Sequence, residues 1–299
     1  MALTMLAVSA VVFLMLELTP GNVAVKVLGQ YSTAEQQRLW LEANGYFDPL
    51  HERYLRWLAN LLSGDFGESL RYRVPVAEVL WPRLGNTLLL GAAVFAVLIP
   101  LSLTLGVMAA LREGRSTDRA ISVVSIVTTS VPEFASAVLL SALFVFALGW
   151  LPGTSAMAAG FDWRELVLPV LVLVLYDFGY VTRMTRASMV EVMTQPYIRT
   201  AVLKGLSYRA VVLRHALRNA LIAPFTVIML QVNWLLSGVI VVEVFFAYKG
   251  FGALLLEASL FQDIFLIEAC AMVAVVVAVG TQTLADIGYA YLSPRIRFA

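Results

Sequence analysis

Residues 86–111 read NTLLLGAAVFAVLIPLSLTLGVMAAL and decide the fold of this chain. The stretch carries no charged side chain. A helix needs roughly 20 consecutive, mostly apolar residues to cross the hydrocarbon core of a bilayer. These residues therefore predict a membrane-spanning helix from Asn86 to Leu111.

The rest of the chain has the same character. Of its 299 residues, 60% are hydrophobic and 14% are charged, whereas charged residues make up about 25% of an average soluble domain. The net charge of +1 gives no indication of nucleic-acid binding. We expect an all-α, polytopic membrane protein with about six spans. The other five candidates are Ala2–Leu18, Ala120–Leu148, Leu166–Thr182, Leu221–Val242 and Ile264–Tyr289.

The first candidate span is short and has no basic residue before it, which is unusual for a cytoplasmic N-terminus. A signal peptide is one alternative, although a charged leading region and a clear cleavage site are missing. A start site placed too far downstream is another.

Basic residues gather in alternate loops, which sets the expected orientation because such loops stay in the cytoplasm. The loops after the third and fifth spans contain one basic residue each, Arg164 and Lys249. Both termini and loop 183–220 are therefore expected inside, and segment 19–85 outside. The inner basic residues are Arg112, Arg115, Arg119, Arg183, Arg186, Arg199, Lys204, Arg209, Arg214, Arg218, Arg295 and Arg297.

The outer segment, 19–85, carries two helix patterns. Ser32 or Thr33 is expected to cap the first helix, and Asn44-Gly45 to end it. Residues 50–62 have the apolar spacing of an amphipathic helix. This second helix lies either in the outer headgroup region or as a packed lid on the helix bundle, which we prefer.

The sequence of loop 183–220 predicts two helices separated at Gly205. A helix over Pro196–Lys204, capped by Thr194, would place Tyr197, Ala201 and Lys204 on one face. Gly205 suits the left-handed residue that closes a helix, and Ser207 can cap the next one. The small residues Ala201 and Gly205 would permit close approach of another protein. The alternative is an ordinary basic loop that obeys the orientation rule.

Four acidic residues fall at membrane depth: Glu133, Asp177, Glu268 and Asp286. Such groups are costly there and often functional. Glu133 follows Pro132 at a local break in the third span. Asp177 is expected either to snorkel or to pair with an arginine of a neighbouring helix. Each is either a hydrogen-bonded structural group or, for Glu133 and Asp177, part of a wet path for a polar or cationic solute. Glu243 is expected to face solvent at the outer end of the fifth span.

Several chemistries are disfavoured. The chain lacks Gly-x-x-x-x-Gly-Lys-Ser/Thr, the usual phosphate cradle for ATP, and has no nucleophile-elbow or zinc-protease motif. Its two histidines, His51 and His215, lie far apart, and Cys270 is its only cysteine. We expect no catalytic, cofactor or metal residues. A self-sufficient secondary transporter or channel remains an alternative, although no matched pair of broken spans is visible.

Residues 197–206, YIRTAVLKGL, resemble the cytoplasmic coupling loop of permease subunits of bacterial binding-protein-dependent ABC importers, in the dipeptide, oligopeptide and nickel permease family. The motif glycine is Gly205, and Arg199 stands where the general motif has an acid. Asp177 is a second departure from the family pattern, because the resemblance leads us to expect a neutral residue there. Further stretches that agree in order are 18–21 (LTPG), 64–70 (GDFGESL), 131–134 (VPEF), 150–153 (WLPG), 182–189 (TRMTRASM), 215–219 (HALRN), 249–252 (KGFG) and 292–297 (LSPRIR).

The resemblance implies a type I importer permease in the bacterial inner membrane. It implies a second homologous permease, two ATPase subunits that hold ATP and Mg, and a periplasmic substrate-binding protein as partners. Peptides or related small polar solutes would be transported. The residues that the resemblance assigns to ATPase coupling are Tyr197, Arg199, Thr200, Ala201, Lys204, Gly205 and Leu206.

Overall fold

The computed structural model describes residues 2–18 and 22–292, and every named element in these ranges is helical. The chain divides into two compact units. The first unit holds residues 1–86 and 250–279, and the second holds 87–249 and 280–299. The predicted tail arginines, Arg295 and Arg297, lie outside the described residues, as does most of stretch 18–21.

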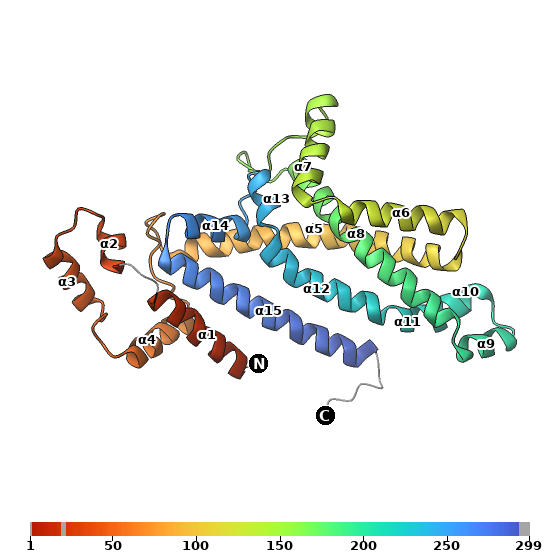
Figure 1. Ribbon diagram of the computed structural model, residues 1–299, viewed down its shortest axis with the longest axis horizontal. Helices are drawn as coiled ribbons and strands as arrows, with labels where there is room; N and C mark the ends of the chain where they lie inside the picture. Colours follow the sequence, from red (N-terminus) through yellow and green to blue (C-terminus); the bar gives the residue numbers. More distant parts are fainter. Residues whose placement is uncertain (1, 19–21, 293–299) are drawn as a thin grey trace. The chain divides into compact units, whose positions relative to one another are not determined.

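In the first unit α1 packs against α4 (Figure 1). Aromatic and ionic side-chain contacts join the two helices. The Phe13 ring lies 5.5 Å from that of Tyr54 and 5.6 Å from that of Trp57. Arg53 donates two hydrogen bonds to Glu17, of 2.5 and 2.6 Å. The helices here are α1 (Ala2–Glu17), α2 (Val23–Leu28), α3 (Ala34–Ala43), α4 (Leu50–Ser63), α14 (Phe251–Leu260), and parts of α5 (Val76–Leu111) and α15 (Ile264–Leu292).

The local signals of the outer segment are confirmed. Thr33 caps α3 in a capping box with Gln36, and the helix ends at Asn44. The amphipathic helix forms as α4. Its contact with α1 favours the lid interpretation, although Leu55 and Leu62 on α4 stay exposed.

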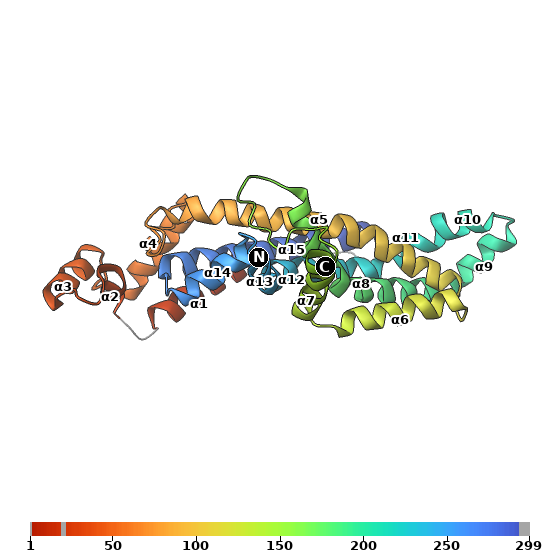
Figure 2. The same cartoon turned by 90° about the horizontal axis from the view of Figure 1, so that it is seen from above.

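The second unit is built around α8, which packs along α6 (Figure 2). Its buried core includes Leu90, Leu173 and Phe246. The helices are the rest of α5 and α15, with α6 (Ser116–Ser130), α7 (Glu133–Ser141), the π-helical turn η1 (Ala142–Ala147), α8 (Trp163–Met193), α9 (Pro196–Leu203), α10 (Tyr208–Ala210), the π-helical turn η2 (Val211–Ala216), α11 (Leu217–Ala220), α12 (Ile222–Gly238) and α13 (Ile240–Phe245).

Two glycines let helices approach α8 closely. A Cβ at Gly179 would lie 2.0 Å from the backbone oxygen of Ser125 on α6. A Cβ at Gly106 on α5 would lie 2.8 Å from the backbone oxygen of Thr182. Both distances are too short for any side chain, so α5 and α6 meet α8 backbone to backbone, as small residues allow in membrane helices.

Three described helices are long and apolar enough to cross a membrane: Val76–Leu111, Trp163–Met193 and Ile264–Gly288. The total rises to five if each of two bent helix pairs is one span. The pair Ser116–Ser130 and Glu133–Ala147 bends by 100°, and the pair Tyr208–Ala220 and Ile222–Val232 by 47°.

Two sequence predictions need comment. The predicted break in the third span is confirmed at Val131-Pro132, where the chain bends by 100°; proline removes a backbone donor and restricts the residue before it. The first predicted span forms as α1, a shorter apolar helix of 16 residues.

Candidate coupling surface and buried carboxylates

Loop 183–220 folds as two helices joined at a glycine. Pro196 begins α9, Lys204 caps its end, and Gly205 has φ of +77°, the left-handed conformation that was predicted. The Ser207 hydroxyl caps α10 by accepting from the Ala210 N–H, as predicted. The predicted N-cap is wrong: Gln195 occupies that position, and the Thr194 hydroxyl instead donates to the Glu191 carbonyl at the end of α8.

One face of α9 anchors the hairpin to its own chain. Ile198 and Ala201 are buried with Val211, Val212 and Ala216 of η2. The small size of Ala201 therefore permits close contact between α9 and η2 within this chain. Predicted coupling residues thus divide between a buried anchor and an exposed face.

The exposed face mixes apolar and basic side chains. Leu203 is 78% exposed and Leu206 41%. Arg199, Thr200 and Lys204 are also exposed. Exposed apolar groups rimmed by polar ones mark interaction surfaces. We call Tyr197, Arg199, Thr200, Val202, Leu203, Lys204, Gly205, Leu206 and Tyr208 the coupling face.

A buried ion pair fixes α6 to α8. Arg186 donates to the two carboxylate oxygens of Asp118 at 2.5 and 2.7 Å, and the Gly114 N–H donates to the same carboxylate at 2.9 Å. Asp118 is 4% exposed. In the sequence analysis Arg186 served only to set the membrane orientation, and Asp118 was not singled out. The position of Asp118 among the inner arginines could have indicated an ion pair.

We expect the substitution Asp118→Asn to lower the free energy of unfolding by about 1.5–3 kcal/mol, the usual contribution of a hydrogen bond to a charged group. The matched control is Asp48→Asn, because Asp48 pairs with Arg56 on the surface, with both side chains more than a third exposed. Exposed pairs contribute about 0–1 kcal/mol. Thermal unfolding of both variants in detergent checks this, and equal small shifts would contradict it.

Asp177 is fully buried in the second unit. Gln231 of α12 donates a short hydrogen bond to its Oδ1 atom, whereas Oδ2 has no hydrogen-bond partner among the described residues. Of the two sequence alternatives, pairing with an arginine of a neighbouring helix is not seen among the described residues, because α12 brings Gln231 to Asp177 instead.

Glu133 begins α7 at the sharp bend. One of its carboxylate oxygens, Oε2, is buried without a hydrogen-bond partner among the described residues. The bend borders a hollow lined by Thr129, Ser130, Val131, Pro132, Glu133, Phe134, Tyr176 and Val241. We call this the carboxylate hollow.

Three other acids are placed differently. Glu243 is fully buried and not facing solvent as predicted; Thr87 Oγ1 donates to it at 2.5 Å, because α13 packs into the core instead of ending at the surface. Glu268 accepts from the Trp57 Nε1 at 3.0 Å in the first unit. Asp286 is exposed and accepts from Gln282 at 3.3 Å.

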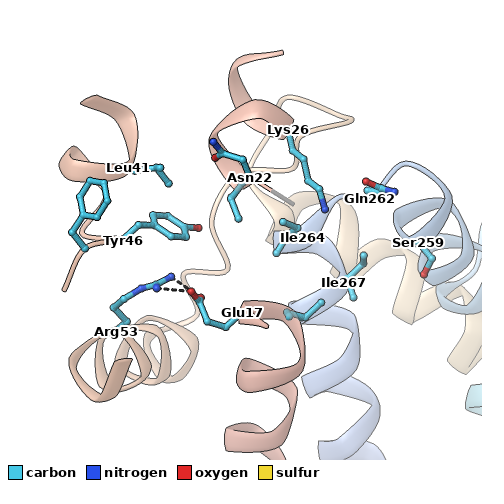
Figure 3. Close-up of a pocket in the computed structure, with 13 residues that line it drawn as sticks. Glu17, Asn22, Lys26, Leu41, Tyr46, Arg53, Ser259, Gln262, Ile264 and Ile267 are labelled. Atoms are coloured by element: carbon cyan, nitrogen blue, oxygen red, sulfur yellow. Dashed lines mark hydrogen bonds and ion pairs between the residues drawn. The ribbon is translucent and has the colours of Figure 1, made fainter. Parts of the chain in front are cut away.

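The first unit contains a separate pocket between α1, α2, α4 and α14–α15 (Figure 3). The Arg53–Glu17 pair lies at its edge, and the Arg53 guanidinium also covers the Tyr46 ring at 4.4 Å. Lys26 extends from α2 toward Ile264. Burial, followed by the charge of Glu268, raises the pKa of the Tyr46 phenol to about 12, so this pocket keeps a neutral phenol at physiological pH.

Residues 102–298 match the family described as binding-protein-dependent transport system inner membrane component. The chain belongs to this family. It is a multi-pass permease component of an ABC transport system of the inner membrane, in which the ATPase is a separate subunit and a binding protein delivers the solute.

Individual relatives match almost the whole chain. The oligopeptide transport system permease protein AppB of Bacillus subtilis is 32% identical, covering 98% of this chain and 95% of its own length. The glutathione transport system permease protein GsiC of Salmonella paratyphi A is 35% identical, covering 99% and 95%. A peptide transport system permease protein of Brucella abortus is 35% identical, covering 98% and 95%.

Proposed function

We propose that this permease forms half of the path of an ATP-driven importer for peptides or related small polar solutes. Its similarity to permeases named for oligopeptide and glutathione transport supports this class of solute. A second homologous permease would complete the path, and two ATPase subunits would bind ATP and Mg.

We place six spans in the membrane, of the type I importer kind, with both termini cytoplasmic. In this arrangement α1 is the first span, residues 19–85 are a periplasmic segment, and residues 86–299 form the permease core. The distribution of basic residues supports it, since loop 183–220 carries seven of them and only one acid, Glu191.

The coupling face is the observation that carries the proposed mechanism. Its underside is anchored on η2, and its exposed side presents Leu203, Leu206 and Arg199 together. A helix held on one side by its own chain can dock with its other side in a groove of the ATPase, so that closure of the ATPases on ATP moves α9 and the helix that follows it. Such coupling is a difference in binding free energy between two states of the transporter.

Affinity purification of the tagged chain from native membranes tests the assignment. We expect an ATPase and a second permease to be recovered in near-equal amounts with it. Recovery of the chain alone in mild detergent, with transport intact, would contradict the proposal and indicate a secondary carrier.

A further inference from the structure

The pocket of the first unit is large enough to hold a small organic molecule. Its cavity volume is about 430 Å³, and small-molecule sites usually measure about 300–1,000 Å³. Leu41, Phe47, Ile264 and Ile267 supply apolar walls. Small-molecule sites combine walls of this kind with a few polar groups that fix the orientation of the ligand. The polar groups of this pocket therefore indicate which class of molecule it binds.

The charged side chains of the pocket leave one positive charge in excess. The ionisable residues that line it, among those the structure describes, are Glu17, Lys26, Tyr46 and Arg53. Arg53 and Glu17 neutralise each other through two hydrogen bonds, of 2.5 and 2.6 Å. The Lys26 ammonium has no hydrogen bond or ion pair within the described parts of the chain. The cavity therefore favours a ligand group with one negative charge.

Tyr46 adds a neutral hydrogen-bond donor to this charge. Burial raises the pKa of its phenol to about 12, so the hydroxyl keeps its proton at physiological pH. Figure 3 shows the Tyr46 hydroxyl and the Lys26 ammonium pointing into the cavity from opposite sides. The hydroxyl has no hydrogen-bond partner among residues 2–18 and 22–292. An ammonium and a phenol O–H that face one space are suitable donors for the two oxygens of a carboxylate.

We infer that this pocket binds the carboxylate of a small organic acid, with Lys26 as the counter-charge and the Tyr46 hydroxyl as a second donor. The apolar walls hold the side chain next to the carboxylate. The C-terminal end of a short peptide has this chemistry, and the choice of a peptide rests on the proposed function. In the proposed orientation the pocket lies on the periplasmic side, where an imported solute arrives. A carboxylate of the binding protein is the rival occupant, although a cavity of this volume suits a small molecule better.

Protection of Lys26 from acetylation tests the inference. The full-length chain, with the subunits that co-purify with it, is placed in phosphatidylcholine nanodiscs and treated with sulfo-N-hydroxysuccinimide acetate, which acetylates accessible amines. The two probes are N-acetylalanylleucine, which has a free carboxylate, and its C-terminal amide, which has nearly the same shape and no charge. Mass spectrometry follows the modification of Lys26.

We expect N-acetylalanylleucine, at about ten times its dissociation constant, to slow the acetylation of Lys26 about tenfold. The amide should need a concentration at least about tenfold higher for the same effect, because it loses the contact between two charged groups. Lys204 is the internal control, since it is an exposed lysine of the second unit that does not line the pocket. Its acetylation should respond to neither probe.

The variant Tyr46→Phe tests the second donor. It keeps the ring that contacts Trp40 and Arg53 and removes only the hydroxyl. We expect the concentration of N-acetylalanylleucine that half-protects Lys26 to rise about threefold to tenfold, the effect of losing one hydrogen bond. Tyr31→Phe is the matched control, because Tyr31 is 92% exposed and does not line the pocket. It should leave the half-protecting concentration unchanged.

Three outcomes would overturn the inference. Equal protection by the acid and its amide, or none by either, would show that the pocket does not recognise a carboxylate. Protection that appears only after addition of the periplasmic binding protein would assign the pocket to a protein contact. Resistance of Lys26 to acetylation without any probe would show that its ammonium does not face an open cavity. The measurement needs no transport activity, so its result is independent of the affinity purification that tests the proposed function.

Discussion

The substitution Gly205→Trp is expected to reduce solute uptake at least ~100-fold, comparable to losing an interface hot spot. Gly205 closes α9 with φ of +77°, a conformation that costs other residues about 1–2 kcal/mol. A Cβ added there meets no atom within 4 Å, so a side chain at this position starts in open space. The side chain would protrude from the coupling face and block docking.

Uptake into cells or proteoliposomes measures this effect, and the amount of variant in the membrane is measured alongside. Gly64→Trp is the control, because Gly64 closes α4 with φ of +83° and also has open space around an added Cβ. It carries the same backbone strain outside the coupling face. Normal uptake by Gly205→Trp, or an equal loss in both variants, would rule out the coupling role.

The substitution Gly179→Leu is expected to remove most of the folded protein. Even a Cβ at this position would lie 2.0 Å from the Ser125 backbone oxygen, and backbone cannot rotate away as a flexible side chain can. Overpacking usually costs about 1–3 kcal/mol and more when it forces backbone apart. Separation of α6 from α8 would also strain the Asp118–Arg186 pair.

The yield of monodisperse protein after detergent extraction, with its unfolding temperature, measures this result. Gly280→Leu on α15 is the control, since a Cβ there meets no atom within 4 Å. We expect that variant to fold as the unmodified chain does. Comparable yields of the two variants would show that α6 and α8 tolerate separation.

The helix ends could be predicted from the sequence because each capping signal acts over a few residues. Thr33, Gly205 and Ser207 were assigned to helix ends from residue type and spacing, and the structure confirms all three positions. The N-cap predicted at Thr194 is wrong because two neighbouring residues could take that position. Pro196 begins α9 directly after Gln195, and the Thr194 hydroxyl bonds to the preceding helix. A local rule could not choose between two adjacent candidates.

The partners of the buried polar side chains could not be predicted in this way. Asp118 and Arg186 are 68 positions apart, and Asp177 and Gln231 are 54 apart. Sequence identifies such groups as costly at membrane depth but does not name their partners. The sequence offers snorkelling or an arginine partner for Asp177, yet the packing of α8 against α12 brings it a glutamine.

Hydropathy, charge bias and helix capping depend on residues close together in the chain. The sequence alone was therefore enough to predict the helical class, the long apolar spans, an orientation and the glycine-closed hairpin. Tertiary packing was needed to show which face of that hairpin is buried, that the chain bends by 100° at Val131-Pro132, and which carboxyl oxygens lack hydrogen-bond partners among the described residues. These properties arise where helices distant in sequence pack together, and each depends on the whole set of neighbours and not on any one segment.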